Sequence, residues 1–153
     1  MTRVNIMSEN TKSFRYQTQI PIRYRDMDTL GHVNNVVYLS YIEQSRIEYF
    51  ADLELWDGDA NELGLILAKS IVSYRAPLTM HDKIVQIDTR ISRLGNKSFD
   101  MEHQLSCVRD EEIIIIADAQ IVMVVFDYIS NQTIVIPDVW RKRIAEYEES
   151  LKN

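Results

Sequence analysis

The stretch that decides the fold runs from residue 23 to residue 50 and reads RYRDMDTLGHVNNVVYLSYIEQSRIEYF. Near its start, five polar side chains fall within ten positions: Asp26, Asp28, His32, Asn34 and Asn35. The glycine among them can adopt a positive φ, which lets the chain turn sharply. Either asparagine is a good N-cap for a following helix. The stretch therefore predicts a tight loop that brings a carboxylate and an imidazole to the N-terminus of a helix.

A helix N-terminus at this position has chemical consequences. Its first backbone N–H groups have no partner within the helix, and the helix dipole adds partial positive charge there. Donors of this kind stabilise a carbonyl oxygen that gains negative charge during a reaction. We therefore expect the loop to be a site where a carbonyl group is polarised and attacked.

The helix itself is predicted over residues 36–53. Val36, Leu39, Ile42, Ile47 and Phe50 recur at helical spacing, and tyrosines at positions 38, 41 and 49 widen the apolar surface. A helix that is apolar on several sides is more often wrapped by a sheet than laid on a surface. We therefore expect it to be buried, with the tyrosines in packing and interface roles.

Most of the remaining chain alternates in polarity or is rich in β-branched residues, which predicts strands. The expected strands cover residues 14–24, 63–76, 83–93, 97–108, 112–128 and 133–136. Pro21 marks the first as an edge or bulged strand, and the run 112–128 is expected to be a central strand buried on both faces. Residues 56–62 form a predicted turn. A terminal helix over 138–149 is expected to dock weakly or to stay loose.

This order of elements predicts an α+β fold in which one long central helix is wrapped by a curled antiparallel β-sheet. We expect three segments along the chain. These are a flexible lead-in over residues 1–13, the main domain over 14–136, and a C-terminal helix and tail over 137–153.

Composition narrows the function classes. The net charge of −6 argues against a general nucleic-acid or anionic-membrane surface. The sequence contains no run of about 18 apolar residues, so we expect no segment that spans a membrane. Cys107 is the single cysteine, so no internal disulfide can form, which suits a reducing compartment. His81 and His103 lack metal-ligand spacing, so we predict no metal. The first ten residues lack the apolar core of a signal peptide, and we expect a cytoplasmic location.

Three groups of residues carry a resemblance to a known family: 24–28 with 31–35, Tyr38, Tyr41, Glu43 and Arg46; 73–77 with Asp82 and Ile84; and 97–99. With these motifs, the chain resembles the hotdog-fold acyl-CoA thioesterases, in the branch named after hydroxybenzoyl-CoA thioesterase, over about residues 14–136. The resemblance implies a sheet that wraps the helix and subunits that pair sheet edge to sheet edge as dimers or tetramers. It also implies active sites at the dimer interface, where the helix N-terminus of one subunit faces elements of the other.

The resemblance assigns catalytic roles within the loop. Asp28 matches the family's catalytic aspartate, and Asn35 matches the position whose backbone N–H donates to the oxyanion. Asp28 either attacks the thioester carbonyl, giving an anhydride that water clears, or activates a water molecule, and the residues leave both routes open. The leaving thiol has a pKa of roughly 8.5, so its departure needs little acid help. Asp26 is the weaker candidate, and we expect it to be structural or a helper.

Three further residues are supporting candidates. Asn34 caps the helix. His32 either positions the acyl group or the water, or is a hydrogen-bonded structural residue. Glu43 lies about two turns into the helix, where it either orients water or Asp28, or pairs with Arg46 at the i+3 position.

The coenzyme A moiety is expected to contact Lys97 and Ser98, which match family positions of that role. Its phosphates call for a cation and hydrogen-bond donors. Some relatives place two arginines directly before this lysine, whereas Gly95 and Asn96 stand there in this chain. Arg93, or else Arg90, is the expected replacement. The alternative is a lysine and a serine that only flank a hairpin.

The predicted function is hydrolysis of an acyl-CoA thioester to a free carboxylic acid and coenzyme A, with the thioester as substrate and no cofactor. A hotdog dehydratase is disfavoured, because its loop of His-Pro-Gly character is missing after Gly31. A non-catalytic acyl-CoA sensor would need a fused DNA-binding segment or a lost catalytic residue, yet Asp28 is present. The acyl group, and the choice between coenzyme A and acyl carrier protein as carrier, stay open.

Overall fold

One antiparallel sheet organises the computed structural model, which describes residues 13–56 and 63–151. Its strands lie in the order β1-β3-β4-β5-β2, and the short β6 pairs with the end of β5. The strands are β1 (Tyr16–Pro21), β2 (Leu63–Tyr74), β3 (Ile84–Leu94), β4 (Ser98–Arg109), β5 (Glu112–Asp127) and β6 (Gln132–Thr133). The helices are α1 (Asn35–Asp52) and α2 (Asp138–Tyr147), with single turns η1 (Tyr24–Asp26), η2 (Met80–Asp82) and η3 (Glu149–Leu151).

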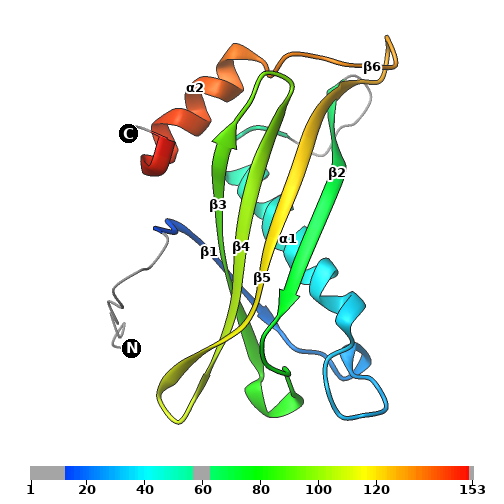
Figure 1. Ribbon diagram of the computed structural model, residues 1–153, viewed down its shortest axis with the longest axis vertical. Coiled ribbons are helices and arrows are strands. Elements are labelled where there is room, and N and C mark those ends of the chain that lie inside the picture. The colour runs from blue at the N-terminus through cyan, green and yellow to red at the C-terminus, as the bar shows by residue number, and fades with distance from the viewer. Residues whose placement is uncertain (1–12, 57–62, 152–153) are drawn as a thin grey trace.

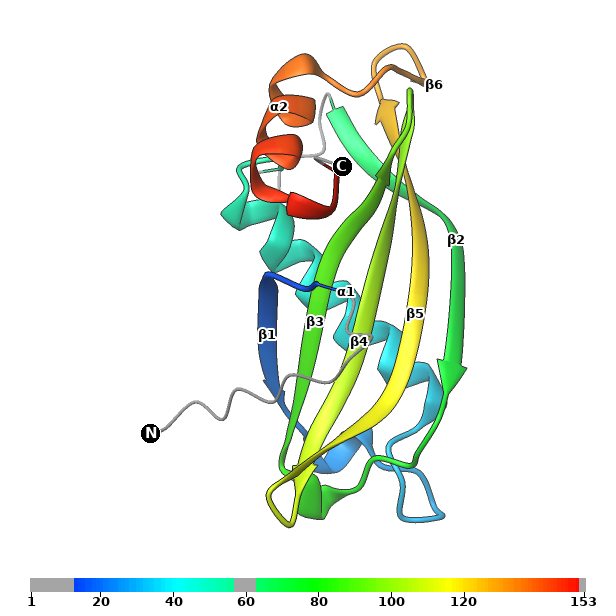
Figure 2. The ribbon, with the colours of Figure 1, turned by 60° about the vertical axis from the view of Figure 1, so that its left-hand side comes forward.

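The long helix α1 lies across one face of the sheet, which curls around it (Figures 1 and 2). The α+β class and the hotdog arrangement expected from the sequence are confirmed. One side of α1 is buried against the strands, through Tyr38, Tyr41, Ile42, Ser45, Tyr49 and Phe50. Burial of each large side chain stabilises the fold by about 1.5–3 kcal/mol.

The other side of α1 is not buried, which contradicts the prediction from its apolar pattern. Three apolar residues that were expected to be buried are exposed in the single chain: Val36 is 70% exposed, and Leu39 and Ile47 are each 38% exposed. The sheet covers the helix side that carries the tyrosines, and the periodic apolar pattern extends beyond that side. A single chain therefore leaves part of the apolar surface of α1 in solvent.

Strand β5 also differs from the prediction of a strand buried on both faces. Its residues alternate, with Ala117, Ala119 and Ile121 buried on the face toward α1, whereas Gln120 is exposed. The strand is central in the sheet, but only one of its faces is covered within this chain. The β-branched composition predicted the strand correctly and its second covered face incorrectly.

Two predicted strands are shorter in the structure. The first was expected to reach residue 24, yet it ends at Pro21 on an edge strand and the chain then forms η1. The last was expected over 133–136, yet only Gln132–Thr133 pair in the sheet. Beyond them, the backbone N–H of Ile134 bonds the Val125 carbonyl and that of Ile136 bonds the Asn96 carbonyl. These N–H groups are satisfied outside a regular ladder, so no strand continues.

The C-terminal helix docks more firmly than expected. Trp140 and Ile144 of α2 are buried in the core. Just beyond α2, the buried Glu148 carboxylate accepts hydrogen bonds from the Tyr49 hydroxyl (2.6 Å) and the Ile91 backbone N–H (2.8 Å). Burial raises the pKa of Glu148, although these hydrogen bonds oppose the shift. The carboxylate therefore ties the chain end to α1 and β3.

Cys107 is buried in β4, as predicted for a strand residue. The turn predicted over 56–62 lies almost entirely outside the described residues. Among the helices that the structure describes, none has the length and apolar character needed to cross a membrane.

A chain of buried polar groups joins α1 to the middle of the sheet. The Ser45 hydroxyl donates to Thr18 (3.2 Å) and shares a hydrogen bond with Thr89 (2.8 Å), which in turn bonds Nδ1 of His103 (2.9 Å). Nε2 of His103 has no hydrogen-bond partner among the described residues. Burial, together with the positive charge of nearby Arg46, lowers the pKa of His103 to about 3. The imidazole is therefore neutral at neutral pH.

Because His103 is buried in its neutral form, the free energy of unfolding should depend on pH. The unfolded chain binds a proton on His103 below a pKa of about 6.5, whereas the folded chain does not until about pH 3, so acidification favours unfolding. Between pH 7.5 and pH 5.0 the free energy of unfolding should fall by about 2 kcal/mol on account of this residue. Urea denaturation at both pH values measures the change.

The control is His81→Gln, because His81 is exposed. The wild type and His81→Gln should show the same pH dependence, and His103→Gln should lack the part due to the buried imidazole. Glu148 acts in the opposite direction, because its raised pKa favours folding at lower pH, but all three proteins retain it. An unchanged pH dependence in His103→Gln would contradict the assignment.

Candidate active site

The turn before α1 is built around the Asp28 carboxylate. Its Oδ1 accepts hydrogen bonds from the backbone N–H groups of Leu30 (2.8 Å) and His32 (3.2 Å), and the Asp28 N–H donates to the His32 carbonyl (2.7 Å). Gly31 has a φ of +80°, as the sharp turn requires. Oδ2 accepts no hydrogen bond from the described residues. One carboxylate oxygen thus fixes the side chain and the other is left for an external group.

Asp26, two residues earlier, lies in a different environment. It is 2% exposed, and its carboxylate accepts hydrogen bonds from the Arg23 backbone (2.9 Å), the Arg23 guanidinium (3.1 Å) and the Tyr41 hydroxyl (2.7 Å). Burial raises the pKa of Asp26, but these bonds outweigh it and hold the pKa below its ordinary value. Its backbone carbonyl also accepts from the Asn34 N–H (2.9 Å). The structural role expected for Asp26 fits these contacts.

The N-terminus of α1 begins directly after the turn. The Asn34 side chain caps it by accepting a hydrogen bond from the Val36 N–H (3.0 Å). The cap leaves the backbone N–H of Asn35, the first helical residue, without a partner among the described residues. On the same residue, the carbonyl accepts a hydrogen bond from the Tyr74 hydroxyl (2.9 Å), so the end of β2 braces the first turn of the helix. An exposed N–H donor therefore stands next to the Asp28 turn.

The other two candidates near the turn lie on the surface. His32 is exposed. Its backbone N–H and carbonyl, and not its ring, make the hydrogen bonds to Asp28. Glu43 is also exposed, and it makes no ion pair with Arg46 among the described residues. Its negative charge raises the pKa of Arg46, although burial dominates and lowers that pKa overall. The pairing of Glu43 with Arg46 is therefore electrostatic and not a direct contact.

The predicted coenzyme A residues lie far from Asp28 within one chain. The hairpin between β3 and β4, which carries Lys97, lies at the end of the sheet near α2, and the turn before α1 lies at the opposite end (Figures 1 and 2). On β5, the partner of Tyr74 is Ala117 and the partner of Ser98 is Val124. Seven residues of strand at about 3.3 Å each separate these positions by about 23 Å.

The three hairpin residues differ in how free they are. Lys97 is exposed. The Arg93 guanidinium makes two hydrogen bonds to the Asp100 carboxylate, both 2.8 Å, and one to the Ser98 hydroxyl (3.3 Å). Arg93 is thus already paired with a carboxylate, which weakens it as a phosphate ligand. Lys97 is the hairpin cation that is best placed for an external anion.

Sequence reasoning missed the hydroxyl contacts of two tyrosines. Tyr41 was expected to pack, yet its hydroxyl also holds Asp26, and Tyr74 was given no role although it braces Asn35. Periodicity identified Tyr41 as a core residue and could not reveal the hydrogen bond. The ring of Tyr74 contacts that of Tyr38 edge-on, which orients its hydroxyl toward the helix start. Within the described ranges, no group of three or more histidine, cysteine, aspartate or glutamate residues is arranged to hold a metal ion.

The chain is similar to known proteins in both sequence and fold. Residues 22–144 match the thioesterase-like superfamily. The long-chain acyl-CoA thioesterase FadM of Escherichia coli strain K12 is 24% identical over 140 residues, covering 85% of this chain and 97% of FadM. A thioesterase of Thermus thermophilus, solved with coenzyme A and Zn, is 30% identical, with a TM-score of 0.74 over 89% of this chain and 96% of its own. A protein from Pseudomonas aeruginosa strain PAO1 is 25% identical, with a TM-score of 0.78 over 90% and 94% of the two chains.

The two carboxylates of the loop should respond differently to amidation. Asp26→Asn weakens charge-assisted hydrogen bonds inside the protein, so the free energy of unfolding should fall by about 2–3 kcal/mol. Asp28→Asn keeps an Oδ1 acceptor for the two backbone donors on a half-exposed side chain, so its stability should change by less than about 1 kcal/mol. Urea denaturation of the two variants beside the wild type measures the difference. Equal losses of stability would show that Asp26 is not the anchor of this loop.

Proposed function

This chain belongs to the thioesterase-like superfamily and is a thioester hydrolase, and we propose that its substrates are acyl-CoA thioesters attacked with the help of Asp28. The observation that carries this proposal is the turn before α1, which leaves Oδ2 of Asp28 and the N–H of Asn35 without partners among the described residues. One group supplies an electron pair to the carbonyl carbon, and the other stabilises the oxygen that becomes negative.

The Asn35 N–H suits an oxyanion because it begins an eighteen-residue helix. The helix dipole adds to the donor strength, and the Asn34 side chain removes the neighbouring Val36 N–H from competition. The hydrogen bond from Tyr74 to the Asn35 carbonyl limits motion of the donor. A donor held in place before the reaction costs no reorganisation when charge develops.

Two routes from Asp28 end in the same products. In the first, Oδ2 attacks the carbonyl carbon, the carbon–sulfur bond breaks, and the coenzyme A thiolate leaves; water then cleaves the mixed anhydride. In the second, Asp28 takes a proton from the water molecule that attacks. Label found in the Asp28 carboxylate after a single turnover in ¹⁸O water would identify the first route, because the second route places label only in the product acid.

Coenzyme A as carrier is supported by the relatives. FadM is named a long-chain acyl-CoA thioesterase, and the Thermus thermophilus relative was solved with coenzyme A. In this chain, Lys97 offers an exposed positive charge for phosphate. An acyl carrier protein thioester is the second candidate substrate, because its prosthetic arm presents the same thioester.

We further propose that each active site is shared between two chains. Asp28 and Lys97 lie at opposite ends of one sheet, and β2 is an unpaired edge of twelve residues with exposed Ile66, Leu67 and Ile71. Exposed edges of this kind pair readily with another strand. If two copies pair antiparallel at β2, two-fold symmetry sets the hairpin of one chain beside the Asp28 turn of the other.

The first test is steady-state hydrolysis of short, medium, long and aromatic acyl-CoAs, followed by release of free thiol. Asp28→Asn should lower kcat by about 10²–10⁴-fold, because the variant lacks the basic, nucleophilic oxygen. Circular dichroism confirms that both proteins are folded, and the panel identifies the acyl class. Tight acyl-CoA binding by the wild type without turnover would favour a binding module, and full activity of Asp28→Asn would redirect attention to Glu43.

The second test examines the shared site by subunit complementation. Asp28→Asn and Lys97→Glu are co-expressed with different tags, and the mixed dimers are isolated by two affinity steps. Each parent should be impaired at low substrate concentration. A mixed dimer with shared sites contains one site with both changes and one intact site, so it should recover about half of wild-type kcat/KM. Activity no higher than the mean of the parents, or a monomeric protein, would contradict the shared site.

A further inference from the structure

The segment between β2 and β3 holds the active-site turn from outside. The Leu78 carbonyl accepts a hydrogen bond from the Val33 N–H (2.8 Å). This backbone hydrogen bond links the turn to the segment between β2 and β3. Leu78 and Tyr38, which lies in the first turns of α1, are both buried in the hydrophobic core. Leu78 thus joins the turn to the core in which the start of α1 packs.

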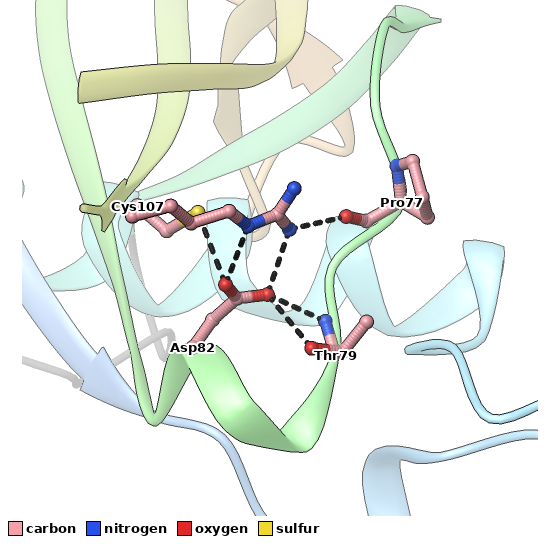
Figure 3. A network of polar contacts seen from close by, with 5 residues as sticks. Pro77, Thr79, Asp82 and Cys107 are labelled. Carbon is pink, nitrogen blue, oxygen red and sulfur yellow. Dashed lines mark hydrogen bonds and ion pairs between the residues drawn. The ribbon is translucent and has the colours of Figure 1, made fainter. Parts of the chain in front are cut away.

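Arg109, near the end of β4, fixes the residues on either side of Leu78. Its Nε donates to Oδ1 of Asp82 (2.7 Å), and its Nη2 donates to Oδ2 of Asp82 (2.8 Å) and to the Pro77 carbonyl (2.6 Å). Asp82 also accepts from the Thr79 backbone N–H (2.7 Å) and from its hydroxyl (3.2 Å). Figure 3 shows the Asp82 carboxylate between Thr79 and Cys107, with its hydrogen bonds to both drawn as dashed lines.

The electrostatics of this cluster favour a rigid arrangement. The Asp82 side chain is 4% exposed, and a two-pronged bond from arginine to carboxylate defines both distance and direction. The Arg109 guanidinium holds the pKa of Asp82 at about 2, against the opposing effect of burial. The pair is therefore fully ionised at neutral pH. Breaking it from one side would leave an uncompensated buried charge.

We propose that Arg109 and Asp82 are positioning residues for catalysis, which act by holding the Leu78 carbonyl in place against the Val33 N–H. Their effect reaches Asp28 and Asn35 through this one backbone hydrogen bond, because Val33 directly precedes the helix cap. Neither residue touches the substrate. The proposal rests on the proposed function for its catalytic part, and its structural part can be measured without turnover.

The kinetic test compares Arg109→Lys, Arg109→Gln and Asp82→Asn. Misplacing a reacting group by about 1 Å can cost about 10²-fold, so kcat of Arg109→Gln should fall by about 10- to 100-fold. KM should change by less than about 3-fold, since substrate contacts are intact. Arg109→Lys keeps the positive charge beside Asp82, and it should fold and show a smaller loss of kcat. The double variant Arg109→Gln with Asp82→Asn should lose no more than the worse single variant.

The matched control is Arg143→Gln. Like Arg109, Arg143 bonds both a carboxylate, that of Glu54 (3.3 Å), and a backbone carbonyl, also of Glu54 (2.5 Å). It lies on α2, at the opposite end of the sheet from the turn (Figure 1). The kcat of Arg143→Gln should remain within about 2-fold of the wild-type value, as expected of a surface substitution. A purely structural effect of losing any arginine pair would instead appear in both proteins.

Hydrogen exchange supplies the readout that is independent of activity. In Arg109→Gln and Arg109→Lys, a peptide covering residues 29–36 should exchange faster than in the wild type and in Arg143→Gln. Unchanged exchange there, or an unchanged kcat in folded Arg109→Gln, overturns the proposal. If the wild type hydrolyses no acyl-CoA, the proposed function fails. The exchange result alone then decides whether Arg109 and Asp82 hold the turn in place.

Discussion

Burial of one side of α1 against the curled sheet is the constraint on which the rest of the structure depends. The helix lies across strands β1 and β3, and its tyrosines and Ile42 are buried in the core between helix and sheet. That placement sets the N-terminus of α1 at one end of the sheet, beside the end of β2, where Tyr74 reaches the Asn35 carbonyl. It also leaves Val36 and Ile47 in solvent. The position of the helix N-terminus and the uncovered apolar side of α1 thus arise from the same packing.

The turn before α1 is held from its buried side and free on its exposed side. Asp26 and Asp28 are two residues apart, yet one is saturated with internal donors and the other keeps an open oxygen. A carboxylate satisfied by arginine and tyrosine is stable as an anion and unreactive. Asp28 is oriented by two backbone N–H groups that bond only its Oδ1, so its Oδ2 accepts no hydrogen bond from the described residues. The turn therefore uses one of two chemically identical groups as its anchor and leaves the other available for the proposed chemistry.

The sequence allowed prediction of the local features and left the long-range ones open. The Asn34 cap, the glycine turn and the β-branched run of β5 follow from short-range rules, and all appear in the structure. The pairing of Glu148 with Tyr49 does not, because it joins residues 99 positions apart and depends on the docked helix. Periodicity likewise revealed that α1 is apolar on several sides, but not which side one sheet can cover. Contacts such as that of Arg109 with Asp82 need the register of β4, which composition does not specify.

The separation of Asp28 from the β3–β4 hairpin bears on why this fold would function as a pair. A thioester of coenzyme A is long, with phosphates at one end and the reactive carbonyl at the other, so its two ends need different surfaces. Along β5, the register position of Tyr74, whose hydroxyl reaches the start of α1, and that of Ser98 in the hairpin are about 23 Å apart. If a partner joins at β2, as proposed, it would place a second hairpin next to the first turn and would cover the exposed side chains of that edge. The apolar surface that a single chain fails to bury would then be the cause of assembly, and assembly would complete the site.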